Sequence, residues 1–312
     1  MKTDPVTPAD LVRSVIAVPP LARAADGSAD FEQNRKIVGW MAEGGVSSFL
    51  YGGNANFYHL GLAEFPAVLD MMVEIAPADG WMIPAFGPDF GKALDQVRIL
   101  RDYDFPTAMA LPMSGPTKPA GVATGLRRIA DAYGRPITAY VRAENYFAPR
   151  DMAALIADGV VCVVKYAVER ADPGTDRYLS ELVEAIGTER LVSGIGERPA
   201  IVHVLDFGVA AFTSGSVTIA PHMSTAILKA LKSGDRQTAE ALRERFLAFE
   251  DQRDAHSPIV VLHDAVQLAR IAETGPIQPY LANLNPGQVA GVADAAKALY
   301  EENRRYLSDP AT

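Results

Sequence analysis

Short apolar runs alternate with helix-like stretches along most of the chain, and this alternation limits the folds that the sequence can adopt. Each run has the length and the residue types of a buried strand. The predicted strands are Val15–Val18, Ser47–Tyr51, Trp81–Phe86, Thr107–Leu111, Pro136–Val141, Val160–Tyr166, Leu191–Ile195 and Ala210–Ser214. The intervening stretches carry apolar residues at helical spacing. The predicted helices are Asp30–Ala42, Glu64–Ile75, Phe90–Arg101, Gly121–Tyr133, Ala148–Ala157, Arg177–Ile186 and Ala200–Phe207.

Eight strands alternating with seven helices favour a closed (β/α)8 TIM barrel, of the α/β class, over an open sheet. From about Pro221 onward the pattern changes to helices alone. These helices are expected at Met223–Ser233, Arg236–Arg253, Pro258–Ala272 and Pro286–Tyr306, with a loop before the last one. We therefore predict a barrel over residues 1–220 and a C-terminal helical extension, residues 221–312, that packs on it.

Composition excludes several classes of protein. The net charge of -9 comes without a basic stripe, so no nucleic-acid partner is expected. No run approaches the roughly 18 uninterrupted apolar residues that a membrane helix needs, and the polar N-terminus carries no secretion signal. Cys162 is the only cysteine, which excludes an intrachain disulfide and a cysteine-based zinc cluster. These features predict a cytoplasmic protein with no membrane partner.

Lys165 ends the predicted sixth strand, Val160–Tyr166, where an ammonium group has no favourable surroundings. Burial without a partner drives a lysine toward its neutral form, and a neutral amine is a nucleophile that forms a Schiff base with a carbonyl substrate. On strand position alone, Lys165 could equally point into solvent or pair with Glu169. The surrounding pattern favours the nucleophile.

Other polar residues follow the predicted strands, at the end of a barrel where functional groups gather. Tyr140 lies on the strand next to that of Lys165 and can relay protons at an imine, or can simply cap a barrel layer. Gly53 and Asn54 belong to a glycine-rich loop that can hold a carboxylate through N–H groups, or can form an ordinary turn. Glu197 and Ser214 follow the last two strands.

Several further polar residues have structural interpretations. Arg142 and Glu144 fit a loop ion pair, as do Glu197 and Arg198. His203 and His222 are isolated, and no spacing of His, Asp or Glu indicates a metal site. The segment around Ser214 does not match a nucleophile elbow, which argues against serine hydrolysis.

These residues together resemble the dihydrodipicolinate synthase / N-acetylneuraminate lyase family of class I aldolases and dehydratases. The similarity runs from Val15 into the C-terminal helices. It rests on Gly52-Gly53-Asn54-Ala55-Asn56, where the family usually has Gly-Thr-Thr-Gly-Glu, on Tyr140 in Pro136-Ile137-Thr138-Ala139-Tyr140, on Lys165 in Val163-Val164-Lys165, and on Ser193-Gly194 and Ser214 through Ala220-Pro221.

The resemblance implies a lyase that needs no cofactor beyond a covalent imine with Lys165. Its substrate would be a small 2-oxo acid, pyruvate or a 2-keto-3-deoxy sugar acid. Tyr140 would move protons, Gly53 and Asn54 would bind the carboxylate, and Glu197 and Ser214 would meet the distal part of the substrate. The family implies a homo-oligomer, either a dimer or a tetramer.

The chain departs from the family pattern at three places. Both threonines of the carboxylate loop are replaced, by Gly53 and Asn54. Leu111-Pro112-Met113-Ser114 stands where a relay tyrosine from a neighbouring subunit is usual, and the usual Asn-x-Pro-x-Arg after Tyr140 is Val141-Arg142-Ala143-Glu144-Asn145. These changes argue against dihydrodipicolinate synthase activity and favour a sugar-acid dehydratase or aldolase. The alternative is a non-catalytic or regulatory barrel that binds 2-oxo acids without turnover, and a metal-dependent aldolase is disfavoured.

Overall fold

Eight parallel strands close into a barrel in which each strand pairs with the next along the chain and β8 pairs with β1. The computed structural model describes residues 1–308, so residues 309–312 of the predicted helical region lie outside it. The strands are β1 (Ile16–Ala17), β2 (Ser48–Tyr51), β3 (Trp81–Phe86), β4 (Met109–Ala110), β5 (Ile137–Val141), β6 (Val161–Tyr166), β7 (Leu191–Ser193) and β8 (Ala211–Ser214). The predicted barrel is confirmed, with each strand inside its predicted range.

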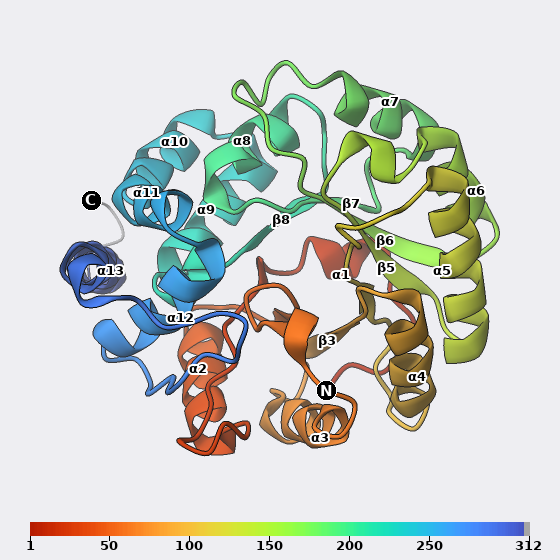
Figure 1. Cartoon of the computed structure of the whole chain (residues 1–312). Helices are drawn as coiled ribbons and strands as arrows, with labels where there is room; N and C mark the ends of the chain where they lie inside the picture. Colours follow the sequence, from red (N-terminus) through yellow and green to blue (C-terminus); the bar gives the residue numbers. More distant parts are fainter. Residues whose placement is uncertain (309–312) are drawn as a thin grey trace.

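The helices form a ring around the strands (Figure 1). They are α1 (Pro8–Leu11), α2 (Phe31–Glu43), α3 (Phe65–Ile75), α4 (Phe90–Leu100), α5 (Pro119–Tyr133), α6 (Pro149–Ala157), α7 (Arg177–Ile186), α8 (Glu197–Leu205) and α9 (Pro221–Ser233), followed by α10 (Arg236–Glu244), α11 (Leu247–Ala255), α12 (Pro258–Leu268) and α13 (Pro286–Ser308). Short 3-10 turns are η1 (Phe57–His59), η2 (Glu144–Tyr146) and η3 (Ser216–Thr218).

Aspartate side chains begin several of these helices. Asp30, Asp89, Asp176 and Asp235 each accept a hydrogen bond from a backbone N–H in the first turn of the helix that follows. A carboxylate at this position satisfies a donor that the helix itself leaves free, and it interacts favourably with the helix dipole. The sequence therefore marks where these helices start.

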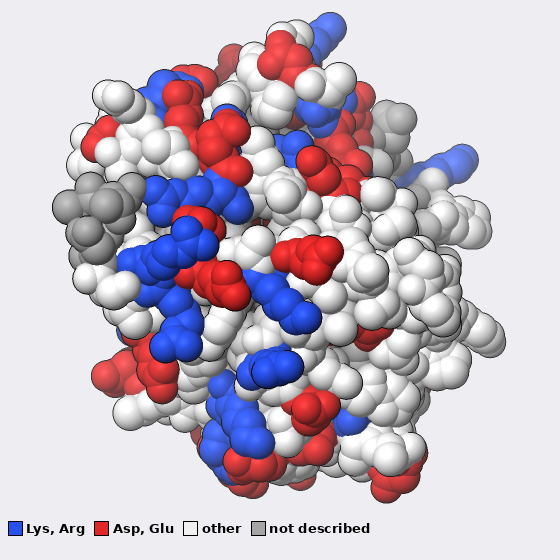
Figure 2. All heavy atoms as spheres, turned by 90° about the vertical axis from the view of Figure 1, so that its left-hand side faces the viewer, with Lys and Arg blue, Asp and Glu red and all other residues white. Residues whose placement is uncertain are grey.

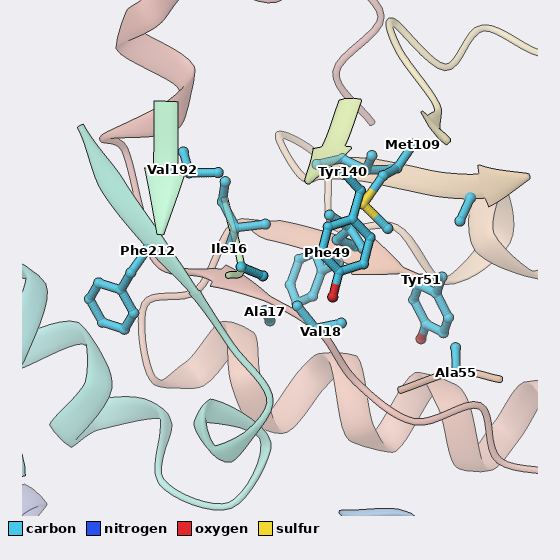
Figure 3. Close-up of a cluster of buried hydrophobic side chains, with 14 of the residues drawn as sticks. Ile16, Ala17, Val18, Phe49, Tyr51, Ala55, Met109, Tyr140, Val192 and Phe212 are labelled. Atoms are coloured by element: carbon cyan, nitrogen blue, oxygen red, sulfur yellow. The ribbon is translucent and has the colours of Figure 1, made fainter. Parts of the chain in front are cut away.

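Every strand is buried along its whole length, because side chains fill the barrel and helices cover it. Side chains from six different strands meet in one apolar cluster: Ile16, Phe49, Met109, Tyr140, Val192 and Phe212 (Figure 3). Tyr140 belongs both to this cluster and to the predicted site, so the apolar core directly adjoins the site.

Several helix predictions differ from the structure, among them Pro258–Ala272, for which α12 ends at Leu268. The predicted helix Arg236–Arg253 is two helices, α10 and α11, separated by a tight turn that places Phe246 in the core with 0% exposure. The predicted helix Ala200–Phe207 is α8, which begins at Glu197. Apolar spacing alone does not show either feature, because both depend on what the helix packs against.

The C-terminal region begins with a helix of the ring. α9 packs against α8 and α2, and so closes the ring between its last and first members. The helices α10 to α13 lie beyond it on one side of the barrel (Figure 1). The boundary at residue 220 between the barrel and the helical extension stays a prediction. The helix α9, which follows it directly, completes the ring of helices around the barrel.

Charges of both signs lie interleaved on the face that α13 presents (Figure 2). Glu302 on α13 pairs with Arg305 at 3.0 Å and with Arg245 at 3.5 Å. On this face the chain shows no stripe of a single sign. Within residues 1–308, no helix combines the length and the apolar character needed to cross a membrane.

The contact between the end of α2 and the start of α9 provides a test of ring closure. A Cβ at Gly44 would lie 2.4 Å from Cβ of Pro221, whereas a Cβ at Gly39 in α2 would meet nothing within 4 Å. We expect Gly44→Ala to lower the free energy of unfolding by about 1–3 kcal/mol through overpacking. Gly39→Ala should raise it by roughly 0.5–1 kcal/mol, because alanine is the better helix former. Urea denaturation of both variants measures this, and equal effects would contradict the packing argument.

Candidate active site

A cavity of about 200 Å³ opens at the C-terminal ends of the strands. Its lining includes Gly53 and Asn54 after β2, Tyr140 on β5 and Lys165 on β6. Active sites of such barrels lie at this end. The structure therefore brings four of the six predicted site residues into one cavity.

Lys165 is buried, with 5% of its surface exposed. It lies directly opposite Tyr140 in the register of β5 and β6, as expected for neighbouring strands. Gly194, beyond β7, leaves room for it, because a Cβ there would lie 3.0 Å from Cγ of Lys165. The alternative of a solvent-facing lysine is wrong, and no ion pair joins Lys165 to Glu169 within residues 1–308.

The environment of the Lys165 amine favours its neutral form. Burial first, and the positive charges of Arg142 and Arg253 next, lower the pKa of this amine to about 7. Both effects act in the same direction, since each penalises the ammonium ion. At neutral pH a large fraction of Lys165 is therefore an unprotonated nucleophile.

Tyr140 forms the wall against which Lys165 lies. The Lys165 Nζ atom is 3.9 Å from the centroid of the Tyr140 ring. In Figure 3 the Tyr140 hydroxyl points toward Val18, another residue of the cavity lining. Burial raises the pKa of this hydroxyl, and the charge of Arg142 opposes that rise. Among the described residues it has no hydrogen-bond partner, so it is free to bond a substrate.

The loop after β2 offers donors from its backbone. Within the described chain, the N–H groups of Gly53, Asn54 and Ala55 donate to no protein acceptor. The Asn54 side chain has a different task, because its Nδ2 donates to the carbonyl of Val18 at 2.8 Å. This bond ties the β2 loop to the end of β1. The geometry therefore offers backbone N–H groups, and not the Asn54 amide, to a carboxylate.

Glu197 and Ser214 do not line the cavity. Glu197 is fully buried at the start of α8, where its Oε1 accepts hydrogen bonds from Ser214 Oγ at 2.6 Å and Ser224 Oγ at 2.5 Å. Burial, and then the charge of Glu250, raise the pKa of Glu197 to about 7. Glu197 and Ser214 are thus hydrogen-bonded to each other outside the cavity lining. Sequence reasoning placed Glu197 in a loop, whereas α8 already includes it and turns it inward.

Several polar residues of the lining were missed or misinterpreted. The expected pair of Arg142 with Glu144 is wrong, because Glu144 pairs with Arg170 while Arg142 faces the cavity. Tyr58 from η1 also lines it. Arg253 and Glu250 reach it from α11, paired at 3.0 Å and both nearly buried. A Glu-x-x-Arg spacing on the predicted helix was the one sequence signal, and nothing in the sequence placed that helix beside the strands.

The remaining predictions about single residues concern structure. Cys162 is buried, and its thiol contacts Thr107 Oγ1 at 3.4 Å. His203 is buried against Ser193, with 2.8 Å between Nδ1 and Oγ. In the described part of the chain no group of three or more His, Cys, Asp or Glu side chains is placed to hold a metal ion. Catalysis without a metal or a cofactor stays a prediction.

Comparison with known proteins agrees with this site. The chain matches the model of the Dihydrodipicolinate synthetase family over residues 12–288, and it belongs to that family. Membership makes it a lyase of the class I aldolase and dehydratase type.

Relatives and solved structures cover nearly all of the chain. A probable 5-dehydro-4-deoxyglucarate dehydratase 2 of Streptomyces coelicolor is 25% identical over 90% of this chain and 88% of that protein. The dihydrodipicolinate synthase of Bacillus clausii superposes with a TM-score of 0.82 at 21% identity, over 93% of this chain and 98% of that one. A catalytic lysine mutant of the Ruminococcus gnavus sialic acid aldolase gives 0.81 at 14% identity, over 95% and 98%. At these identities the two structures support the barrel fold.

The buried amine has a consequence for stability. Its pKa of about 7 lies below the ordinary 10.5, so the unfolded chain binds more protons between these pH values and wild-type stability rises with pH across them. We expect Lys165→Met to increase the free energy of unfolding at pH 7 by roughly 2–4 kcal/mol. This gain should shrink as the pH approaches 10.5.

Urea denaturation at several pH values measures the effect. Lys297→Met, at an exposed position on α13, is the matched control and should show little gain at any pH. A gain at Lys165 that does not change with pH would mean that the amine is not destabilised by burial.

Proposed function

We propose that this protein is a Schiff-base-forming lyase, an aldolase or a dehydratase, that acts on a 2-oxo acid through Lys165. The proposal rests on one observation: the Lys165 amine lies buried at the cavity wall, 3.9 Å from the Tyr140 ring, with a pKa lowered to about 7. A neutral, desolvated lysine is the nucleophile that imine chemistry requires.

A 2-oxo acid fits the arrangement of donors around this amine. Its carboxylate can accept from the unpartnered N–H groups of Gly53, Asn54 and Ala55. Its ketone, one bond away, would then face Lys165 and Tyr140 across the same cavity. Backbone donors bind a carboxylate without adding a positive charge that would compete with iminium formation.

The chemistry follows from these positions. The Lys165 nitrogen attacks the ketone carbon and forms a carbinolamine. Tyr140 gives its hydroxyl proton to the hydroxyl group of the carbinolamine, which leaves as water, and a protonated imine remains. The imine accepts electrons from the neighbouring carbon, so that carbon loses a proton, or a carbon–carbon bond to it breaks. Loss of a hydroxyl one carbon further out then gives a dehydratase.

The rest of the cavity favours a hydroxylated substrate. Opposite the apolar core the lining includes Arg253 and Glu250, with Glu169 and Asp254 nearer the surface. Such groups suit the hydroxyls of a 2-keto-3-deoxy sugar acid better than they suit the methyl group of pyruvate. The similarity to the Streptomyces coelicolor protein, a probable 5-dehydro-4-deoxyglucarate dehydratase, supports the same class of substrate. We expect assembly as a dimer or tetramer, from the family.

Borohydride trapping tests the proposed imine. Incubation with pyruvate or a 2-keto-3-deoxy sugar acid, reduction and peptide mass spectrometry should locate an adduct on Lys165 and on no other lysine. The initial trapping rate should rise with pH through about 7, because only the unprotonated amine attacks the ketone.

Lys165→Met should form no adduct and have no activity, while Lys297→Met should behave as wild type. Reversible binding of these acids without any adduct would replace the proposal with a non-catalytic barrel that binds 2-oxo acids.

Removal of the Tyr140 hydroxyl tests the proton transfer. Tyr140→Phe keeps the ring beside Lys165 and should lower kcat by roughly 10²- to 10⁴-fold with a smaller change in KM. Steady-state kinetics on the substrate found by trapping measure both constants. An unchanged kcat would show that another group supplies the proton.

A further inference from the structure

The Tyr140 hydroxyl has no evident way to recover the proton that it gives to the substrate. Tyr140 is 9% exposed, and its hydroxyl has no hydrogen-bond partner in the described chain. A tyrosine that loses a proton in each turnover must regain one before it acts again. If Tyr140 acts as proposed above, a second hydroxyl in the same cavity can carry protons between it and solvent while substrate occupies the space in front of it.

Tyr58 lies in the right place for this task. It lines the same cavity as Tyr140, and it is partly exposed. Its ring lies over the β2 loop, where a Cβ on Gly53 would be 3.8 Å from Cε2 and 3.9 Å from the hydroxyl oxygen. The Tyr58 hydroxyl therefore lies close to the N–H groups to which we assign the carboxylate.

The segment that carries Tyr58 is held at both ends. Asn56 takes a left-handed backbone conformation with φ 55°, and its Nδ2 donates to the carbonyl of Gln278 at 3.0 Å. Lys92 Nζ donates to the carbonyl of Tyr58 itself at 2.9 Å. These bonds come from α4 and from the loop before α13. These bonds hold η1 in place, and with it Tyr58.

Arg142 completes the group. The guanidinium interacts with the hydroxyls of both Tyr58 and Tyr140, and it lines the same cavity. Burial, followed by the nearby Tyr140, raises the pKa of Tyr58 to about 12, and Arg142 opposes this rise. A positive charge at this point stabilises a phenolate on either tyrosine. Two further titratable groups lie near this pair: Glu169, whose charge raises the pKa of Tyr140, and Lys165, whose Nζ is 3.9 Å from the Tyr140 ring centroid.

We propose that Tyr58 is a proton-relay residue, which acts through Tyr140 and is supported by Arg142, all within one chain. The inference rests on the proposed function. The segment Leu111-Pro112-Met113-Ser114 contains no tyrosine that could act as a relay. Tyr58 gives the site a second tyrosine from the same chain, without a contribution from a neighbouring subunit.

The proton balance is simple. Tyr140 protonates the departing hydroxyl of the carbinolamine and becomes a phenolate. The Tyr58 hydroxyl returns a proton to that phenolate, and Arg142 stabilises the negative charge while it is on Tyr58. Bulk water then reprotonates Tyr58. That reprotonation leaves a hydroxide ion in solvent, and the proton that the carbon next to the imine loses in the following step reaches it through Tyr140 and Tyr58, so no net proton is gained or lost.

The test compares Tyr58→Phe with Tyr146→Phe in the full-length protein. Tyr146 is a matched control, because it is a half-buried tyrosine of the neighbouring loop whose hydroxyl accepts from Met113 N–H at 3.1 Å and which does not line this cavity. We expect Tyr58→Phe to lower kcat by roughly 10- to 100-fold with little change in KM, since a positioned proton-transfer group contributes at least this much. Tyr146→Phe should retain wild-type kcat.

Two further measurements separate a relay from a structural role. In Tyr58→Phe the solvent deuterium isotope effect on kcat should increase, because proton transfer to and from Tyr140 becomes slower. Thermal unfolding of the variant should match that of wild type.

Borohydride trapping keeps this test distinct from that of the proposed function. An adduct on Lys165 in wild type, together with unchanged kcat and isotope effect in Tyr58→Phe, would overturn the relay and leave the lyase intact. A fall in kcat without a larger isotope effect would also overturn it, and would make Tyr58 a packing residue. No adduct in wild type would remove both proposals.

Discussion

The desolvation of one amine is the constraint on which the site depends. Lys165 lies on a strand that is covered on both faces, and 5% of its surface is exposed. No carboxylate pairs with it in the described chain, and the charges that lower its pKa, those of Arg142 and Arg253, are positive. A lysine placed in this way is neutral near pH 7 instead of stabilised as an ammonium ion. The barrel supplies the burial, because eight strands and their helices exclude water from the base of the cavity.

The charged residues around the cavity are arranged so that they do not cancel this effect. Glu250 is held by Arg253 at 3.0 Å and by the Ser216 hydroxyl. Glu197 lies behind the wall, bonded to Ser214 and Ser224. Arg142 is free of the loop ion pair that its sequence neighbours suggested, since Glu144 binds Arg170. Glu250 and Glu197 thus have partners other than Lys165, and the positive charges of Arg142 and Arg253 lower the pKa of the amine.

Local pattern predicted the strands well and the polar contacts poorly, for physical reasons. A buried strand needs a continuous apolar run, so Val160–Tyr166 and the other seven ranges each contain the observed strand. A helix start depends on local capping as well as on packing, and α8 begins at Glu197 through a glycine that adopts φ 80°. The turn between α10 and α11 exists because Phe246 enters the core, which no spacing of apolar residues reveals. The side-chain amide of Asn54, expected to face the substrate, instead joins two strand ends.

The sequence by itself determined the barrel, the burial of Lys165 and its position beside Tyr140, because strand order in a (β/α)8 barrel follows chain order and neighbouring strands align their ends. The family model matches the chain over residues 12–288. Only the tertiary structure decided which distant groups share the cavity. Arg253 arrives from α11, 88 positions after Lys165 (253 − 165), and Tyr58 from a 3-10 turn after β2. Their placement depends on how whole helices and loops pack on the barrel, and that packing is settled by the sum of many weak contacts instead of by any local pattern.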